Sequence, residues 1–159
     1  MVAISRPGAD WPDRILEVAK RFMNAEVCFY EETEPATPYN PVTGEGGATG
    51  IRIIWRGHAR VQHLRAPREF ATTYQAEATR FFRFQIDPNE TWDGSSVPFL
   101  PQGVKARVIA GGRDSDLESL AFVTTSAINS SHMAVRTVEL SSNMTSVAWQ
   151  WNPDSPGGE

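Results

Sequence analysis

One segment constrains the fold more than any other, because residues 51–65 (IRIIWRGHARVQHLR) alternate apolar or small side chains with polar ones. The odd positions are Ile51, Ile53, Trp55, Gly57, Ala59 and Val61, and the even positions include Arg52, Arg56, His58, Arg60 and Gln62. A period of two predicts a β-strand with one face in a core and one basic face. We expect Gly57 to mark a bulge or bend, as glycine inside a strand often does.

Other segments with strand character are spread along the rest of the chain. Residues 79–86 alternate with Phe82, Phe84 and Ile86 on the inner face, and Cys28 is expected to be buried or half-buried in a strand of its own. Residues 117–128 and 133–140 are predicted to form a hairpin. The remaining predicted strands cover residues 26–32, 104–110 and 144–151.

A helix is predicted only near the N-terminus, over residues 11–23. Its apolar positions recur at helical spacing and are expected to pack on a sheet; they are Trp11, Ile15, Val18, Ala19 and Phe22. One helix ahead of six to eight short strands predicts a mainly β protein. We therefore expect a small antiparallel barrel or sandwich with long loops.

The 159 residues match the usual size of one domain, so a single domain over residues 1–159 is expected. Residues 1–9 are predicted to be a flexible arm and residues 152–159 a flexible tail. Residues 33–50 hold three prolines and four glycines and are predicted to be a long loop. Such loops tend to be functional or disordered. We favour an interaction element, with a passive excursion as the alternative.

Charge is unevenly distributed along the chain. The net charge of −4 divides into −4 for residues 1–50, +5 for residues 51–86 and −5 for residues 87–159. This overall balance argues against a dedicated duplex-DNA binder. A basic middle between acidic flanks suits a protein that meets copies of itself or charged neighbours, whereas internal pairing is the alternative. On the predicted strand, Arg52, Arg56 and Arg60 share one face.

Motifs for catalysis or metal binding are missing from the sequence. His58 and His63 are five residues apart, on opposite faces of a strand, and His132 is far away. The acidic run Asp114, Asp116 and Glu118 lacks the pattern of a calcium loop and suits a solvated turn. No nucleophile elbow, phosphate-binding loop or His-Glu-x-x-His motif is present. We therefore predict no catalytic, cofactor or metal site, and no enzyme. The chain also has no apolar run long enough for a membrane span and no signal-peptide profile, so no membrane partner is expected.

Three short motifs carry a family resemblance over roughly residues 11–141. They are Asn-Pro-Val-Thr-Gly at 40–44, Trp-Arg-Gly-His-Ala-Arg-Val-Gln at 55–62 and Arg-Thr-Val-Glu-Leu at 136–140. With the order of the elements, they make the chain resemble the head-to-tail stopper proteins of long-tailed bacteriophages, especially those of actinobacteria. This resemblance implies a small β-barrel without enzymatic activity or cofactor.

The resemblance also implies partners and a location. Stopper proteins form a homo-oligomeric ring, here expected to be a hexamer or dodecamer, between the portal and adaptor side and the tail terminator side. The ring would retain packaged double-stranded DNA and let it pass without sequence specificity. The protein would be made in the host cytoplasm and end in the virion, at the head–tail joint.

Two sets of residues acquire expected roles from this resemblance. A loop would reach into the channel, through Tyr39, Asn40, Pro41, Thr43 and Gly44. The basic row Arg52, Arg56 and Arg60 would face an acidic neighbouring subunit. Charge reversal at Arg56 is then expected to block joining while leaving the monomer folded.

Other functions remain open at this point. A single-stranded nucleic-acid-binding barrel would place aromatic and basic residues on one face, and Phe81 with Arg83 or Lys105 with Arg107 are the candidates. Another virion part of similar size, such as a tail terminator, is a further alternative.

Overall fold

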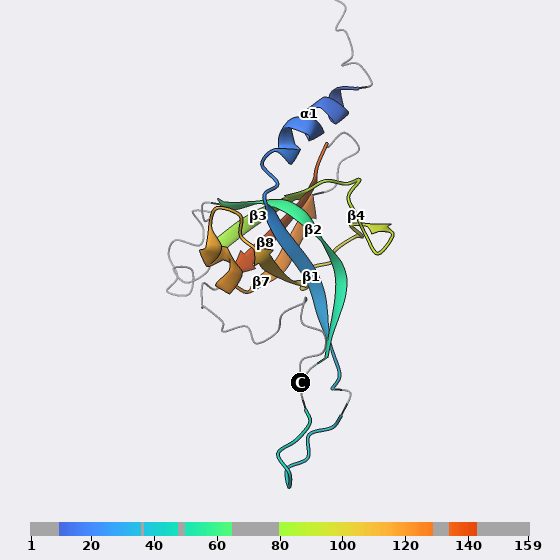
Figure 1. The fold of residues 1–159 in the computed structure, drawn as a ribbon, viewed down its shortest axis with the longest axis vertical. Coiled ribbons are helices and arrows are strands. Elements are labelled where there is room, and N and C mark those ends of the chain that lie inside the picture. Colours follow the sequence, from blue (N-terminus) through green and yellow to red (C-terminus); the bar gives the residue numbers. More distant parts are fainter. Residues whose placement is uncertain (1–9, 36, 48–49, 65–79, 129–133, 143–159) are drawn as a thin grey trace, which may run out of the picture.

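The computed structural model describes residues 10–35, 37–47, 50–64, 80–128 and 134–142. Within these ranges, six strands close into one antiparallel barrel in the order β1-β2-β3-β8-β7-β6 (Figure 1). Their bounds are β1 Ala25–Thr33, β2 Gly50–Leu64, β3 Arg80–Ile86, β6 Lys105–Ala110, β7 Phe122–Ile128 and β8 Arg136–Ser142. The helix α1, Trp11–Lys20, precedes the barrel. The predicted mainly β class with one N-terminal helix is confirmed.

Aromatic side chains fill the barrel interior. Phe29 lies against Trp55, with ring centroids 6.5 Å apart, and Phe84 meets Phe122 at 5.3 Å. Phe82 contacts Phe122 edge-on at 5.0 Å. Each of these rings is buried, and for Trp55, Phe82 and Phe84 the alternation in β2 and β3 predicts it. Tilted and edge-on pairs of this kind add to the energy of simple burial.

The bulge in β2 is not at Gly57, so the prediction of a bulge there is wrong. Phe29 pairs with Trp55 and the next residue, Tyr30, pairs with Ile53, so Ile54 is the extra residue of the bulge. Gly57 itself lies in regular register. Its role is to make room, because an added Cβ would collide with the ring of Trp55. A glycine in a strand marks either a bulge or a close approach, and here it marks the second.

Several predicted boundaries also shift. Residues 87–103, between the predicted strands 79–86 and 104–110, contain the small hairpin of β4 (Thr91–Trp92) and β5 (Ser95–Ser96). The predicted strand 117–128 begins only at Phe122, because Ser115–Ser119 forms the 3₁₀ helix η2. The predicted strand 133–140 is shifted to Arg136–Ser142. The predictions for residues 1–9, 129–132, 144–151 and 152–159 lie outside the described residues.

The helix α1 also differs from expectation, because its apolar face does not pack on the sheet. Leu16 and Met23 are buried, whereas Ile15, Val18 and Phe22 are 47%, 55% and 55% exposed. Figure 1 shows α1 standing at one end of the barrel. The physical reason is that a closed barrel holds its apolar side chains inside, which leaves little apolar outer wall for a helix to cover.

Candidate interaction surfaces

The segment between β1 and β2, residues 34–49, projects from the barrel, and we call it the tongue. Figure 1 places the tongue and α1 at opposite ends of the long axis. The two strands that support it extend beyond the part of β1 that pairs with β6, which covers residues 26–30. From Glu31 to Thr33, β1 pairs with β2 alone. The tongue is therefore the end of a two-stranded ribbon that leaves the barrel wall.

Asn40 organises the tip of the tongue. Its backbone N–H donates to the carbonyl oxygen of Glu45, and its own carbonyl accepts from the N–H of Gly44, both at 2.8 Å. Its side-chain Oδ1 accepts from the N–H of Val42 at 2.9 Å. Asparagine favours such turns because its short side chain can bond to the backbone two residues ahead. The predicted long loop is thus a hydrogen-bonded hairpin at its tip.

Two glycines let the tongue fold back on itself. Gly46 has a φ of +83°, and a Cβ there would collide with the carbonyl oxygen of Pro38. Gly47 has a φ of +77°, and its N–H donates to the carbonyl of Thr37 at 2.9 Å. Left-handed backbone is costly for residues with a Cβ. The Gly46-Gly47 pair therefore permits the close approach of the two limbs.

The tongue presents apolar and acidic groups to solvent. Val42 is 91% exposed and Tyr39 63% exposed, and the side chains of Glu34 and Glu45 are exposed as well. Residues 34–49 contain no lysine or arginine. The structure brings all five predicted channel-loop residues together here, namely Tyr39, Asn40, Pro41, Thr43 and Gly44.

The predicted basic row does not share one face of β2, because the bulge at Ile54 shifts the register by one residue between Arg52 and Arg56. Arg52 lies opposite Glu31 and Arg56 opposite Cys28, two positions that point to opposite faces of β1. Both arginines are paired within the chain. Arg52 binds Glu31, and Arg56 Nε lies 2.5 Å from Glu26 Oε1. Both carboxylates belong to the adjacent strand β1: Glu31 lies directly opposite Arg52, and Glu26 lies opposite His58, two residues from Arg56. Internal pairing, the alternative considered from the sequence, therefore accounts for the charges of Arg52 and Arg56 in the free chain.

Arg60 differs from the other two arginines of the row. Its guanidinium lies 5.2 Å from the ring centroid of Phe22 and 3.5 Å from the Gln85 side-chain oxygen. No carboxylate among the described residues forms an ion pair with it. Arg60 thus belongs with the α1 end of the molecule, whereas Arg52 lies at the tongue end.

Arg56 is also part of a partly buried cluster on the outer wall. It lies beside Cys28, which is fully buried, and Arg107 flanks the same cysteine from β6. Burial raises the pKa of the Cys28 thiol to about 12, although Arg56 and Arg107 act in the opposite direction. The thiol is therefore held in its unreactive neutral form. Charge reversal at Arg56 would place a new carboxylate beside that of Glu26. This substitution would therefore destabilise the fold as well as any contact between subunits.

The residues considered for nucleic-acid binding are also engaged. Arg83 Nη2 lies 3.0 Å from Glu139 Oε1, and Lys105 Nζ lies 2.6 Å from Glu32 Oε1. Burial lowers the pKa of Arg107. A phosphate would have to displace carboxylates to reach Arg83 or Lys105. This pairing weakens the electrostatic term on which nucleic-acid affinity depends.

The histidines serve local structure. Glu90 accepts from the backbone N–H of His58 at 3.0 Å and contacts His58 Nδ1 at 2.7 Å. Glu90 thus gives the backbone N–H of His58 an acceptor, one residue before the pairing of β2 with β3 starts at Ala59. His63 lies edge-on to Phe82. The described residues contain no group of three metal-ligand side chains, and His132 lies outside them.

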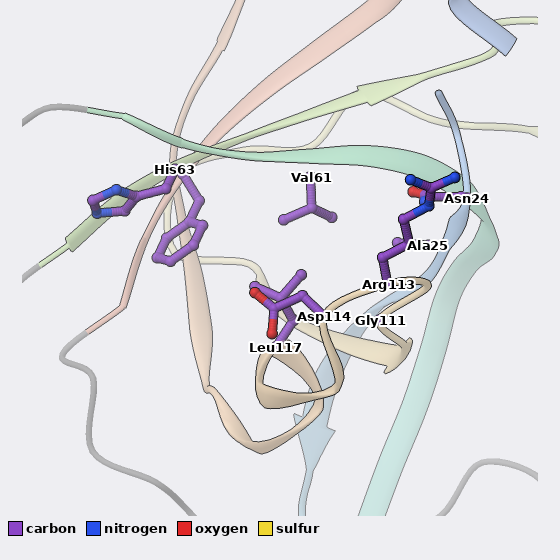
Figure 2. A pocket seen from close by; sticks show the side chains of 9 residues that line it. Asn24, Ala25, Val61, His63, Gly111, Arg113, Asp114 and Leu117 are labelled. Atoms are coloured by element: carbon purple, nitrogen blue, oxygen red, sulfur yellow. The ribbon is translucent and has the colours of Figure 1, made fainter. Parts of the chain in front are cut away.

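Figure 2 shows from close by a cavity at the mouth of the barrel that no sequence pattern predicts. It has a volume of about 260 Å³ and is lined by residues from β1, β2, β3, η2 and the turn before η2, including Val61, His63 and Leu117. Figure 2 shows Asp114 at the centre of this rim. The Asp114 carboxylate accepts from the N–H of Asp116, and Glu118 accepts from the N–H of Gly111. The acidic run therefore shapes η2 and its turn.

Together these features define a class of protein: a closed antiparallel barrel with a hairpin tongue at one end and a helix at the other. Within that class, the chain belongs to DUF6093, a family of unknown function, whose model matches residues 16–141. No curated protein and no solved structure matches the chain. In the part of the chain that the structure describes, no helix is long and apolar enough to cross a membrane.

Proposed function

We propose that this protein is a structural component of the bacteriophage neck, a head-to-tail stopper. It would form a homo-oligomeric ring of six or twelve copies below the portal and adaptor, retain packaged DNA and offer a docking surface to the tail. The support is the resemblance of residues 40–44, 55–62 and 136–140 to that class, together with a barrel of the kind the resemblance implies.

The observation that carries the proposal is the tongue. It is a hydrogen-bonded projection at one end of the barrel, which suits a part that reaches from a ring into a central channel. Its charged side chains are carboxylates, and it has no basic residue that would bind phosphate. A channel wall that does not neutralise phosphates lets double-stranded DNA pass without salt-dependent retention. Tyr39, Asn40, Pro41, Thr43 and Gly44 would form the inner edge of that channel.

The ion pairs indicate which of the three arginines Arg52, Arg56 and Arg60 is available for a contact between subunits. The Arg52 side chain is 67% exposed and the Glu31 side chain 44% exposed, so their pair contributes little to the stability of the free chain. Arg52 is therefore the member of the row best able to exchange its partner for a carboxylate of a neighbouring subunit. Arg56 is less available, since its side chain is 20% exposed.

The test is immunogold electron microscopy of phage particles from the source lysate, with antibody against the recombinant chain. We expect label at the head–tail joint. Label on the tail tube or tail tip would keep a virion role but overturn the stopper role. An antibody that recognises the native protein yet labels no particle disrupted at the neck would overturn both.

A further inference from the structure

A groove lies between α1 and the barrel wall, at the end of the molecule opposite the tongue. Its volume is about 520 Å³, and it is lined by Arg14, Ile15, Val18, Ala19, Phe22, Arg60, Gln85 and Val135. Ile15 and Val18 lie on one face of α1, Phe22 follows two residues after its end at the continuing i+7 position, and each is about half exposed. Apolar residues at this spacing form the face that an amphipathic helix presents to an apolar partner.

The charged residues that line the groove are both cationic. Arg14 pairs with Asp10 at 2.9 Å, but their side chains are 81% and 60% exposed, so this pair is weak. Arg60 lies over the ring of Phe22 at 5.2 Å. The groove therefore fits a segment that combines apolar side chains with carboxylates and lacks basic residues.

One terminal segment of this chain has that chemistry. Residues 143–159, which follow β8 and lie outside the described structure, contain Val147, Trp149 and Trp151 at alternate positions. They also contain Asp154 and Glu159, and no lysine or arginine. The other segments outside the description fit less well. Residues 1–9 carry Arg6, residues 65–79 carry two arginines, and residues 129–133 carry no carboxylate.

The length of this segment favours docking between copies over docking within one chain. Val135 borders the groove, and Ser142, at the end of β8, is seven residues away, which is about 23 Å along a strand. Trp149 is seven residues beyond Ser142, and an extended chain covers at most about 3.6 Å per residue. Docking in the same copy would therefore require a fully extended segment running straight back along the barrel.

We propose that residues 143–159 of one copy dock in the α1 groove of a second copy, with Trp149 and Trp151 against Ile15, Val18 and Phe22. This inference deepens the proposed ring and rests on the self-assembly that the ring requires. The contact joins two different surfaces, so it is heterologous and can repeat from copy to copy. Such contacts generate closed rings when the rotation closes, and filaments when it does not.

The test uses purified full-length protein and sedimentation velocity over a range of concentrations. The groove variant is Val18→Glu, with Ile15→Lys as a second version, and the segment variant is the double change Trp149→Ala and Trp151→Ala. Phe99→Glu is the matched control, because Phe99 is 66% exposed and lies outside the groove. Val42→Asp removes the exposed apolar residue of the tongue, and circular dichroism verifies that each variant is folded.

We expect the wild-type protein and both control variants to associate. The groove variant and the segment variant should each associate at least about tenfold more weakly, because burying one apolar side chain contributes about that much affinity. A mixture of the groove variant with the segment variant should form dimers that grow no further, because one intact groove meets one intact segment.

The remaining outcomes overturn the inference. They are a wild-type protein that stays monomeric, a mixture that fails to form dimers, and association lost on Val42→Asp but kept in the segment variant. Because the purified chain is used alone, these results are independent of where antibody labels a virion. Association with label away from the neck would reject the stopper role and keep the docking contact.

Discussion

At the residue scale, the ring of Trp55 packs so closely against Gly57 that a larger residue at position 57 does not fit. The two residues lie on the inner face of β2, and the ring lies where a Cβ on Gly57 would be. Trp55 is fully buried, so it has little room to move. A single methyl group at position 57 is therefore an overpacking change.

We expect Gly57→Ala to lower the free energy of unfolding by about 1–3 kcal/mol, the usual cost of overpacking a core. Urea unfolding followed by tryptophan fluorescence and circular dichroism measures this loss. In the background of Trp55→Leu, which removes the large ring, the same alanine should cost less. Equal costs in both backgrounds would show that the collision is not the cause.

Two buried groups on the outer face of β1 make stability depend on alkaline pH. Burial raises the pKa of Cys28 from 9.0 to about 12 and that of Tyr30 from 10.0 to about 12. Each group is neutral when protonated, and the folded state keeps its proton to higher pH. Above the ordinary pKa the unfolded state loses the proton first, so the unfolded state is favoured as pH rises.

We therefore expect the free energy of unfolding to be steady below pH 9 and to fall above it, by up to about 1.4 kcal/mol per pH unit for each group. Urea unfolding at pH 8, 9, 10 and 11 measures this. Cys28→Val should flatten the fall between pH 9 and 10, where the thiol titrates in the unfolded state before the phenol. An unchanged slope in that variant would contradict the assignment to Cys28.

At the scale of elements, the tongue and α1 share a property: each is attached to the barrel at one end and carries exposed apolar groups. The tongue keeps its shape through local backbone bonds, such as that from Gly47 to Thr37. In the helix, Lys20 pairs with Asp87 at 3.2 Å and Leu16 is buried. Neither element contributes to the core cluster, whose buried members come from the barrel strands and the loops around them.

We expect Gly46→Ala to open the tongue without changing the stability of the barrel. The substitution combines a positive φ with a collision against the Pro38 carbonyl, whereas Gly44→Ala, the matched control, has a positive φ and open space around it. Amide hydrogen exchange by NMR should show faster exchange at Gly47 in the first variant than in the second. A lower urea midpoint for global unfolding, or equal exchange in the two variants, would contradict this account.

At the scale of the whole molecule, β1 is a barrel strand that is paired along both edges and buried through its middle. It pairs with β2 on one side and β6 on the other, and its residues Val27, Cys28 and Phe29 are fully buried. The helix α1 has one buried residue within its bounds, Leu16. Local stability should therefore differ strongly between these two elements, because burial and pairing set the free energy of local opening.

We expect amides of α1 to exchange much faster than those of β1 in native-state hydrogen exchange. The β1 amides should exchange with a free energy close to that of global unfolding, whereas α1 should open by local fluctuations with a small dependence on denaturant. Exchange of both elements at the same free energy would show that the helix is part of the cooperative unit. The measurement should be made at a protein concentration at which the chain is monomeric.

Much of the barrel could be predicted from the sequence because period-two alternation is a local property. Phe82, Phe84 and Ile86 in β3 all face inward as their spacing indicates. The bulge at Ile54 could not be predicted, since it depends on which residue of β1 stands opposite. For the same reason, the carboxylate partners of Arg52 and Arg56 became known only once β1 was placed beside β2.

The sequence by itself determined the fold class, the helix near the N-terminus and the position of the projecting segment, because each follows from local periodicity or from the spacing of glycine and proline. The tertiary structure decided which faces are covered. The apolar stripe of α1 predicts burial, yet barrel closure places the core inside the strands and leaves Ile15, Val18 and Phe22 half exposed. Periodicity identifies an apolar face, but only the placement of other elements determines what that face contacts.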